Sequence, residues 1–332
     1  MLRSAIFLFS LAFILLLSAS GRDGRDLFGK TPRMTVERVP LDLRDPTRTR
    51  VGALTYLGGI RLKSPELAFG GFSSMRIVGD DFTLLSDGGT FIRFRMGKDW
   101  QPRNVQFGDL PAGPGSGWLK RDRDSESMTN DPVTGKVWVG FEQYNAIWRY
   151  NADLTRAERS VRPAAMRDWS SNGGPESLVR LHDGRFLTIG ETSRPKGSRI
   201  GREGLLFPGD PTAPDIKPIR FVYMPPDEQH DPSDAAQLPD GRLIVLNRRF
   251  SVPGLFTAKL TLIDPREIRP GGAVLRGTEI ATLAAPLLHD NYEALAVTRE
   301  GDDTILWIAS DDNQQFWEWS LLLKFRIEFS RR

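Results

Sequence analysis

Residues 175–191 read PESLVRLHDGRFLTIGE. Two apolar runs flank Asp183-Gly184, and this dipeptide is a strong signal for a β-hairpin because both turn positions must accept a positive φ. One acid, Glu176, stands at the start of the first run, and a second acid, Glu191, follows the end of the second run. The segment therefore predicts a hairpin with a carboxylate at the open end of each strand.

The same unit occurs five times along the chain. A second clear copy is residues 233–247, SDAAQLPDGRLIVLN, and three degenerate copies complete the set. The spacings between leading positions are 52, 50, 58 and 59 residues, and these positions are Ser74, Glu126, Glu176, Asp234 and Glu293. A repeat of this length with three or four short strands per unit is typical of a β-propeller.

We therefore expect an all-β fold, a β-propeller with five or six blades, preceded by an N-terminal signal segment. A sixth blade would combine N-terminal strands, at residues 36–43 and 54–62, with a C-terminal strand at residues 321–329. An eight-stranded sandwich is the alternative, but nothing in a sandwich requires a 50-residue repeat.

Composition narrows the class of protein. The 332 residues carry a net charge of only +3, which gives no case for a nucleic-acid binder. The absence of Cys excludes disulfides, thiolate metal sites, a Cys nucleophile and a lipobox anchor. We expect a monomer that is stabilised by its core and by a bound cation.

The N-terminus has the features of a targeting segment. Arg3 precedes an apolar run at residues 6–17, and Ser18-Ala19-Ser20 offers small residues for cleavage. We expect a signal peptide at residues 1–20, a flexible tether at 21–35 and a propeller domain at 36–332. The protein would be periplasmic or secreted; the alternative is a membrane anchor through an uncleaved N-terminal segment.

The repeat predicts a cluster of acids. In a propeller, the start of each inner strand and the end of the next strand lie at the same mouth of the central channel. Glu126, Glu176, Asp234 and Glu293 would therefore meet Asp87, Glu142, Glu191 and Asp311. So many carboxylates repel one another unless they are neutralised, and a hard divalent cation such as Ca²⁺ takes 6–8 oxygen ligands. We predict these eight acids as ligands of a divalent cation, Ca²⁺ in the first instance.

Basic and imidazole side chains accompany the acids. We expect Arg93, Arg95, Arg248 and Arg249 to bind an anionic substrate; the alternative is that Glu and Arg only pair between blades. His230 and His289 each stand four residues before a leading acid. Either is a candidate for a general base or a metal ligand, against the alternative of a loop histidine with no such role.

Several short motifs recur around the repeat: Gly70-Gly71-Phe72-Ser73-Ser74-Met75, the Leu-x-Asp-Gly-Arg hairpins, Asn247-Arg248-Arg249-Phe250-Ser251, Asp290-Asn291-Tyr292-Glu293-Ala294 and Ser310-Asp311-Asp312-Asn313. Together these motifs resemble the exported bacterial proteins grouped as the "esterase-like activity of phytase" family. The resemblance covers roughly residues 50–327 and implies a phytase-like propeller that hydrolyses ester or phosphoester bonds. This sequence departs from the family at Ser74, Asn247 and residues 314–317.

Three functions follow as hypotheses. The first is a cation-assisted hydrolase of phosphomonoesters or related small anionic esters. The second is a lactonase or carboxyl esterase of the gluconolactonase type, in which Asn291 and Asn313 would matter more than the arginines. The third is a non-enzymatic periplasmic propeller that binds a ligand without converting it.

Overall fold

The computed structural model describes residues 24–252 and 254–328. The signal peptide expected at residues 1–20 lies outside these described residues. No helix in the described part of the chain is long and apolar enough to cross a membrane.

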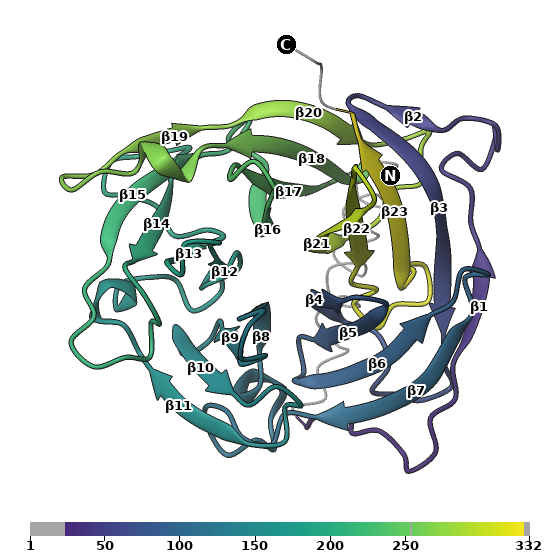
Figure 1. Ribbon diagram of the computed structural model, residues 1–332, viewed down its shortest axis with the longest axis horizontal. Coiled ribbons are helices and arrows are strands. Elements are labelled where there is room, and N and C mark those ends of the chain that lie inside the picture. Colours follow the sequence, from purple (N-terminus) through teal and green to yellow (C-terminus); the bar gives the residue numbers. More distant parts are fainter. Residues whose placement is uncertain (1–23, 253, 329–332) are drawn as a thin grey trace, which may run out of the picture.

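Five sheets stand as blades around one axis, so the predicted β-propeller is confirmed, with five blades (Figure 1). Blade 1 consists of β4 (Phe72–Val78), β5 (Asp81–Ser86), β6 (Thr90–Met96) and β7 (Pro102–Asp109). Blade 2 consists of β8 (Ser125–Asn130), β9 (Val137–Phe141), β10 (Ala146–Tyr150) and β11 (Ala157–Val161). Blade 3 consists of β12 (Val179–Arg180), β13 (Phe186–Ile189), β14 (Arg202–Phe207), β15 (Ile219–Met224) and the parallel β19 (Val274–Arg276).

Blade 4 consists of β16 (Asp231–Gln237), β17 (Leu243–Ser251), β18 (Leu255–Ile263) and β20 (Thr278–Leu283). Blade 5 joins β21 (Tyr292–Glu300), β22 (Asp303–Ser310) and β23 (Leu321–Ile327) to β3 (Leu54–Lys63) and β1 (Thr35–Arg38), with β2 (Arg50–Val51) paired to β3. Three short 3₁₀ helices lie outside the sheets: η1 (Lys120–Asp122), η2 (Ala164–Met166) and η3 (Pro265–Glu267).

The ring closes inside blade 5. β23 pairs antiparallel with β3, with Leu322 opposite Ile60, and β1 covers the outer edge of β3. The N-terminal strands therefore complete the last blade and do not form the sixth blade that the sequence left open. This ladder hydrogen-bonds the two ends of the domain to each other.

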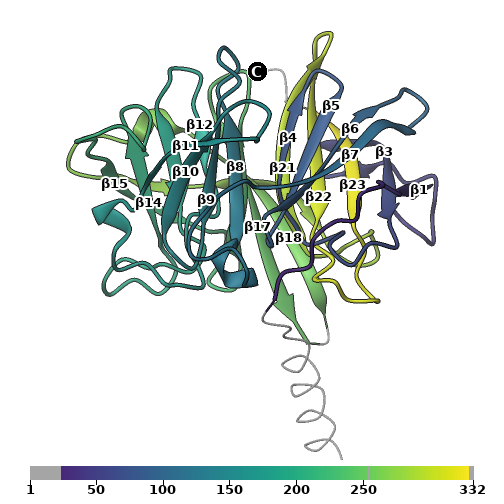
Figure 2. The same ribbon diagram turned by 90° about the horizontal axis from the view of Figure 1, so that it is seen from below.

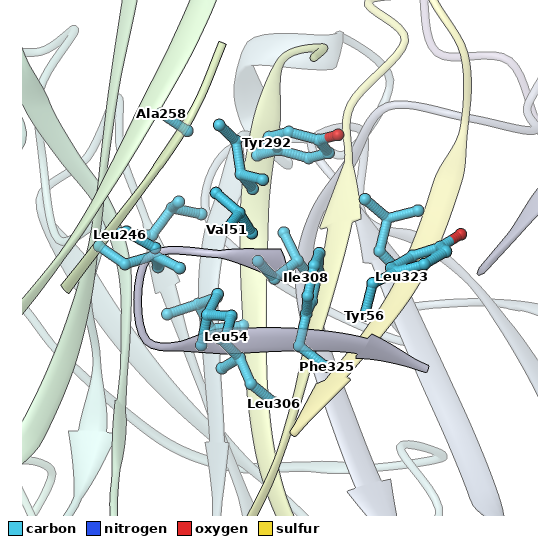
Figure 3. Close-up of a cluster of buried hydrophobic side chains, with 14 of the residues drawn as sticks. Val51, Leu54, Tyr56, Leu246, Ala258, Tyr292, Leu306, Ile308, Leu323 and Phe325 are labelled. Atoms are coloured by element: carbon cyan, nitrogen blue, oxygen red, sulfur yellow. The ribbon is translucent and has the colours of Figure 1, made fainter. Parts of the chain in front are cut away.

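Apolar side chains fill the spaces between blades. Figure 3 shows Leu54 of β3, Ile308 of β22 and Phe325 of β23 in one cluster, which also includes residues of blade 4 such as Leu246. All four side chains are fully buried. Burial of each stabilises the fold by about 1.5–3 kcal/mol relative to exposure. The apolar residues of the repeat thus hold the blades at a constant angle to one another.

The hairpins give the propeller two distinct ends. At residues 175–191 the predicted hairpin is present, and Val179 pairs with Leu187. His182 and Asp183 are the central residues of its turn, which the N–H of Gly184 closes by donating to the carbonyl oxygen of Leu181. Of the pair Asp183-Gly184 only Gly184 has a positive φ, 89°. We call the end where the inner strands begin the mouth, and the end with these first turns the far end. At the mouth, β17 and β18 continue beyond the other strands as a long hairpin, seen at the lower centre of Figure 2.

Candidate functional site

A β-bulge begins the inner strand of four blades. In blade 2, Ser125 pairs with Phe141 and Ser127 with Gly140, so Glu126 is left between them without a partner. A bulge takes the extra residue out of the ladder and redirects its side chain. Blade 3 has the Pro175–Gly190 bridge just before Glu176. The residues at this first position, in blades 1 to 5, are Ser73, Glu126, Glu176, Ser233 and Glu293.

The end of each second strand supplies another position at the mouth. On the second strand, one residue pairs with the residue just before the first position. In blades 1 to 5 this residue is Ser86, Phe141, Gly190, Asn247 and Ser310. The residue that follows it is a carboxylate in four blades and an arginine in blade 4. These second-position residues are Asp87, Glu142, Glu191, Arg248 and Asp311.

Two overlapping groups of three carboxylates form where blades 2 and 3 meet. The first contains Asp124, Glu126 and Glu142, and the second contains Glu142, Glu176 and Glu191. Within each group, one oxygen from each residue lies within 4.8 Å of the others. We call these five residues the acidic centre. Because Glu142 belongs to both groups, it is the residue that joins them.

Two cations stand beside the acidic centre. Arg248 Nη2 lies 2.9 Å from Glu191 Oε1, and Arg248 Nε lies 3.2 Å from Glu293 Oε1. On the other side, Lys120 of η1 pairs with Asp87. Asp124, Glu126, Glu142 and Glu176 form no ion pair in the described structure. Positive charge therefore flanks the acidic centre at Arg248 and at Lys120, and the four acids between these two side chains have no ion-pair partner of their own among the described residues.

Burial and mutual repulsion raise the pKa values of these acids. Burial first, then the carboxylates of Asp124 and Glu191, raise the pKa of Glu142 to about 9. Burial also raises the pKa of Glu126 and Glu176 well above the usual range, and each acid adds to the shift of its neighbours. For Glu293 the effect of burial is opposed by Arg248, and the pKa is about 7. At neutral pH the acidic centre therefore retains protons that a divalent cation would displace.

An amide group next to Glu293 is only half satisfied. Asn291 is 2% exposed and donates from Nδ2 to Glu293 Oε1 at 2.8 Å. Its Oδ1 is buried and has no hydrogen-bond partner among the described residues. Carboxylate and amide oxygens are the donors that Ca²⁺ and Mg²⁺ prefer, and neither group of acids contains a nitrogen or sulfur ligand. The side chains at this mouth therefore fit a hard divalent cation.

Asp234 does not belong to this set. The bulge in β16 is at Ser233, so Asp234 lies one residue beyond the position of Glu126. Its Oδ2 accepts a hydrogen bond of 2.6 Å from the backbone N–H of Leu295, on the inner strand of blade 5. In the sequence, Asp234 was matched with Glu126 because both are acids. In the structure, the residue of blade 4 that occupies the bulge position of Glu126 is Ser233. Asp234 therefore ties two blades together.

The arginines predicted for substrate binding are divided between the two ends of the propeller. Arg93 pairs with Thr83 in the middle of blade 1, and Arg95 forms an ion pair with Asp81 near the far end. Arg248 and its neighbour Arg249, on the long hairpin, lie at the mouth. Only Arg248 contacts the acids, so the structure brings one of the four arginines to the acidic centre.

Neither histidine predicted as a base bonds to the acidic centre. His230 is 3% exposed, and its Nδ1 lies 2.9 Å from both carboxylate oxygens of Asp227. His289 Nδ1 lies 2.7 Å from the carbonyl oxygen of Leu287. His230 Nε2 also lies 3.2 Å from Thr257 Oγ1 of β18, so both ring nitrogens of His230 have partners outside the acidic centre.

Two residues of the mouth were missed from the sequence, Asp124 and Lys120. Asp124 stands two residues before Glu126, so strand alternation would have placed both on one side. Lys120 has no counterpart in the repeat, and only the fold brings it to Asp87. The two-residue spacing between Asp124 and Glu126 could therefore have identified Asp124 from the sequence, whereas no sequence feature pointed to Lys120.

Exposed apolar side chains lie on loops around the mouth. Trp118 precedes β8 and is 78% exposed, and Phe316 and Trp317, between β22 and β23, are 89% and 48% exposed. Phe250 and Leu255 on the long hairpin are also about half exposed. We call these five residues the apolar rim. Exposed apolar groups gathered at one face indicate a binding surface.

Comparison with known proteins gives one family. The family model Phytase-like, described as "Esterase-like activity of phytase", matches residues 67–314. The matched region contains the acidic centre, Arg248 and Glu293. No curated protein sequence matches the chain.

Many solved structures resemble the chain at low identity. The α-L-arabinofuranosidase of Podospora anserina, in complex with cellotriose, has 11% identity and a TM-score of 0.49, and the match covers 83% of this chain and 97% of that one. The glutaminyl cyclase of Myxococcus xanthus has 11% identity, a TM-score of 0.44 and coverages of 79% and 92%. The hydrazine synthase of Kuenenia stuttgartiensis has 9% identity and a TM-score of 0.37; the match covers 74% of this chain but spans only 58% of that chain.

Proposed function

The chain belongs to the Phytase-like family, whose model spans residues 67–314, and from this premise we propose that it is an exported hydrolase of small anionic esters, phosphomonoesters first, that works with a divalent cation at the propeller mouth. The observation that carries the proposal is the pair of carboxylate groups that share Glu142, in which Glu191 alone among the described residues has an ion-pair partner.

Asp124, Glu126, Glu142, Glu176 and Glu191 would hold the cation, and Asn291 Oδ1 is a further oxygen at the same mouth. A bound divalent cation polarises a phosphoryl or carbonyl oxygen and favours ionisation of a bound water. The all-oxygen donor set favours Ca²⁺ or Mg²⁺ over transition metals. Occupancy would also relieve the repulsion that keeps these carboxyls protonated at neutral pH.

Arg248 would orient the anionic group of the substrate. Its guanidinium stands between Glu191 and Glu293, and among the described residues it is the only arginine that forms an ion pair with an acid of the two mouth positions. A guanidinium can offer parallel N–H donors to a phosphate or carboxylate. Lys120 would add a second positive charge near Asp87.

Glu293 is the best candidate for the general base. Its carboxylate bonds to Asn291 and faces Arg248, and its pKa is about 7. A carboxylate that titrates near neutral pH can accept the proton of an attacking water at Oε2 or Oε1. The apolar rim would contact the uncharged part of the ester. The apolar run at residues 6–17 supports export to the periplasm or beyond.

A lactonase or carboxyl esterase is the second candidate. The observation that favours it is the unpartnered Oδ1 of Asn291 beside Glu293, because an asparagine oxygen is one of the ligands expected for a site of this type. In that case Arg248 would balance Glu191 and Glu293 and would not contact the substrate.

The test is a substrate panel on the purified protein, with metal content measured first. Aryl phosphates, aryl carboxylates and lactones are compared in EDTA and after Ca²⁺ or Mg²⁺ is restored. Phosphatase turnover that EDTA abolishes and Ca²⁺ restores supports the first proposal, and turnover of lactones alone supports the second. Bound metal with no turnover of any ester would leave a binding propeller and reject both enzymes.

A further inference from the structure

A row of polar side chains crosses all four strands of blade 1. Arg76 of β4 pairs with Thr83 of β5, Thr83 pairs with Arg93 of β6, and Arg93 pairs with Gln106 of β7. Residues directly opposite on neighbouring strands project from the same face of a sheet. Two arginines therefore share one face of blade 1, with a single threonine between them.

This face is turned toward blade 2. Phe91, two residues before Arg93 on the same strand, packs in the apolar cluster between the two blades together with Met128 of β8. The mouth half of the blade 1–blade 2 boundary is therefore an apolar core. The polar row continues the same boundary toward the far end, where apolar residues give way to arginines.

A pocket of about 410 Å³ lies at this part of the boundary. The polar row lines it from blade 1, and Ala152 and Asp153, in the turn between β10 and β11, close it from blade 2. This volume falls within the range of small-molecule sites. The pocket does not include any residue of the acidic centre.

The two arginines are poorly satisfied. Arg93 Nε and Nη2 are buried and have no hydrogen-bond partner among the described residues. Both terminal nitrogens of Arg76 bond only to the carbonyl oxygen of Ala152, at 3.3 Å. Burial, with Arg93 close by, lowers the pKa of Arg76 to about 10. Asp153 attracts Arg93 electrostatically, but its carboxylate accepts hydrogen bonds from Thr155 and forms no ion pair with either arginine.

Packing alone does not account for this arrangement. The guanidinium of Arg93 stacks over Phe91, with its carbon 4.8 Å from the ring centre, which satisfies its face but not its N–H edge. Arg95, two residues along the same strand, is fully paired through two bonds of 3.0 and 2.9 Å to Asp81. Buried polar groups in native proteins are normally hydrogen-bonded, so unpaired guanidinium donors at a pocket call for a partner.

We propose that this pocket is a second binding site, separate from the acidic centre, for a small oxyanion of the phosphate or carboxylate class. Arg76 and Arg93 hold the anion from the two positions that flank Thr83 in this row, and the hydroxyl of Thr83 lies between them. Guanidinium donors match the oxygens of such anions through paired hydrogen bonds. The site does not depend on the proposed hydrolase activity.

The experiment is calorimetric titration of the full protein with inorganic phosphate, and separately with malonate, at constant ionic strength in EDTA. EDTA removes cations that could bring an anion to the mouth. We expect saturable binding in the millimolar range, weakened about tenfold or more by Arg93→Gln and by Arg76→Gln. A stronger response to phosphate or to malonate identifies the preferred class of anion.

The matched control is Arg103→Gln, an arginine on β7 of the same blade that pairs with Asp99 outside the pocket. It should bind within about twofold of the wild-type affinity. Arg248→Gln, at the mouth, should also leave this binding unchanged. Arg93→Lys, which keeps the charge but loses the paired donors, replaces Arg93→Gln if that variant does not fold. The proposal is overturned if neither anion binds saturably, if Arg93→Gln and Arg93→Lys bind like wild type, or if Arg248→Gln alone abolishes binding.

Discussion

The guanidinium of Arg248 lies 2.9 Å from the carboxylate of Glu191, which holds the same position in the neighbouring blade. Four blades place an acid there, and one places a base. The repeat thus carries one charge reversal, and Arg248 at this position supplies one of the two cationic side chains beside the acidic centre. Variants of Arg248 can therefore distinguish the contribution of this charge to stability from its contribution to substrate binding.

Arg248→Gln should destabilise the cation-free protein. Glu191 and Glu293 have side chains only 14% and 10% exposed, and both would lose their counter-charge. Loss of one partner from a largely buried ion pair costs about 2–4 kcal/mol. Thermal unfolding in EDTA at neutral pH measures the change, at roughly 2 °C per kcal/mol for a domain of this size.

Arg248→Lys keeps the charge and serves as the control. It should recover most of the stability but not the turnover of phosphate esters, because an ammonium group cannot offer parallel donors. If Arg248→Gln unfolds at the wild-type temperature, the ion pairs do not stabilise the mouth. If Arg248→Lys hydrolyses phosphate esters at the wild-type rate, the guanidinium does not orient the substrate.

Glu142→Gln should have opposite effects on cation binding and on stability. Glu142 belongs to both carboxylate groups, so its loss should weaken Ca²⁺ binding about tenfold or more. In EDTA above neutral pH the variant should be more stable than wild type. In the wild type, ionisation of the buried Glu142 carboxyl near other acids destabilises the folded state, and the glutamine carries no charge. Calorimetric titration with Ca²⁺ and thermal unfolding test the two effects. Glu300→Gln, which loses an ion pair with Lys324 at the far end, is the control for a change of charge alone.

The cation-free protein should lose stability as pH rises. The pKa of Glu142 is about 9 in the folded protein and near 4.5 when exposed, so between these values the folded state binds more protons than the unfolded state. The free energy of unfolding therefore falls through this window, and the loss is complete above about pH 9. Saturating Ca²⁺ replaces the protons and should flatten the slope. Unfolding temperatures measured across this range, in EDTA and in Ca²⁺, check the sign; a rising temperature in EDTA would contradict it.

The sequence predicted the fold well because the repeat is local. The hairpin at residues 175–191 depends on an Asp-Gly turn and two apolar runs, and both features are visible in the chain itself. The meeting of Glu142 with Glu176 also followed, because it needs only the order of strands within a blade. The association of the N-terminal strands with the C-terminal strand was also expected, but no local pattern showed that they complete the fifth blade and do not form a sixth.

The predictions that changed are those that depend on single-residue register. Asp234 differs from Glu126 by one position after a bulge, and no composition signal marks where a bulge falls. Arg93 follows the acid Asp87 closely in the sequence and was therefore predicted at the mouth. In the structure it is the fourth residue of β6, which runs away from the mouth. Arg248 was predicted at the mouth as a substrate contact. The pairing of Asn247 with Pro232 shows in addition that Arg248 occupies the position at which the other four blades have an acid.

Asp234 should therefore behave as a structural residue and not as a cation ligand. Its carboxylate accepts hydrogen bonds from the backbone N–H groups of Ala235 and Leu295, at 2.7 and 2.6 Å, and it is 3% exposed. Asp234→Ala leaves the N–H of Leu295 without its acceptor and should cost about 1–3 kcal/mol. Asp234→Asn keeps an acceptor oxygen and should lose less. Both variants should bind Ca²⁺ within about twofold of wild type, whereas Glu176→Gln should not. A drop in Ca²⁺ affinity for Asp234→Asn equal to that for Glu176→Gln would return Asp234 to the ligand set and contradict the bulge alignment.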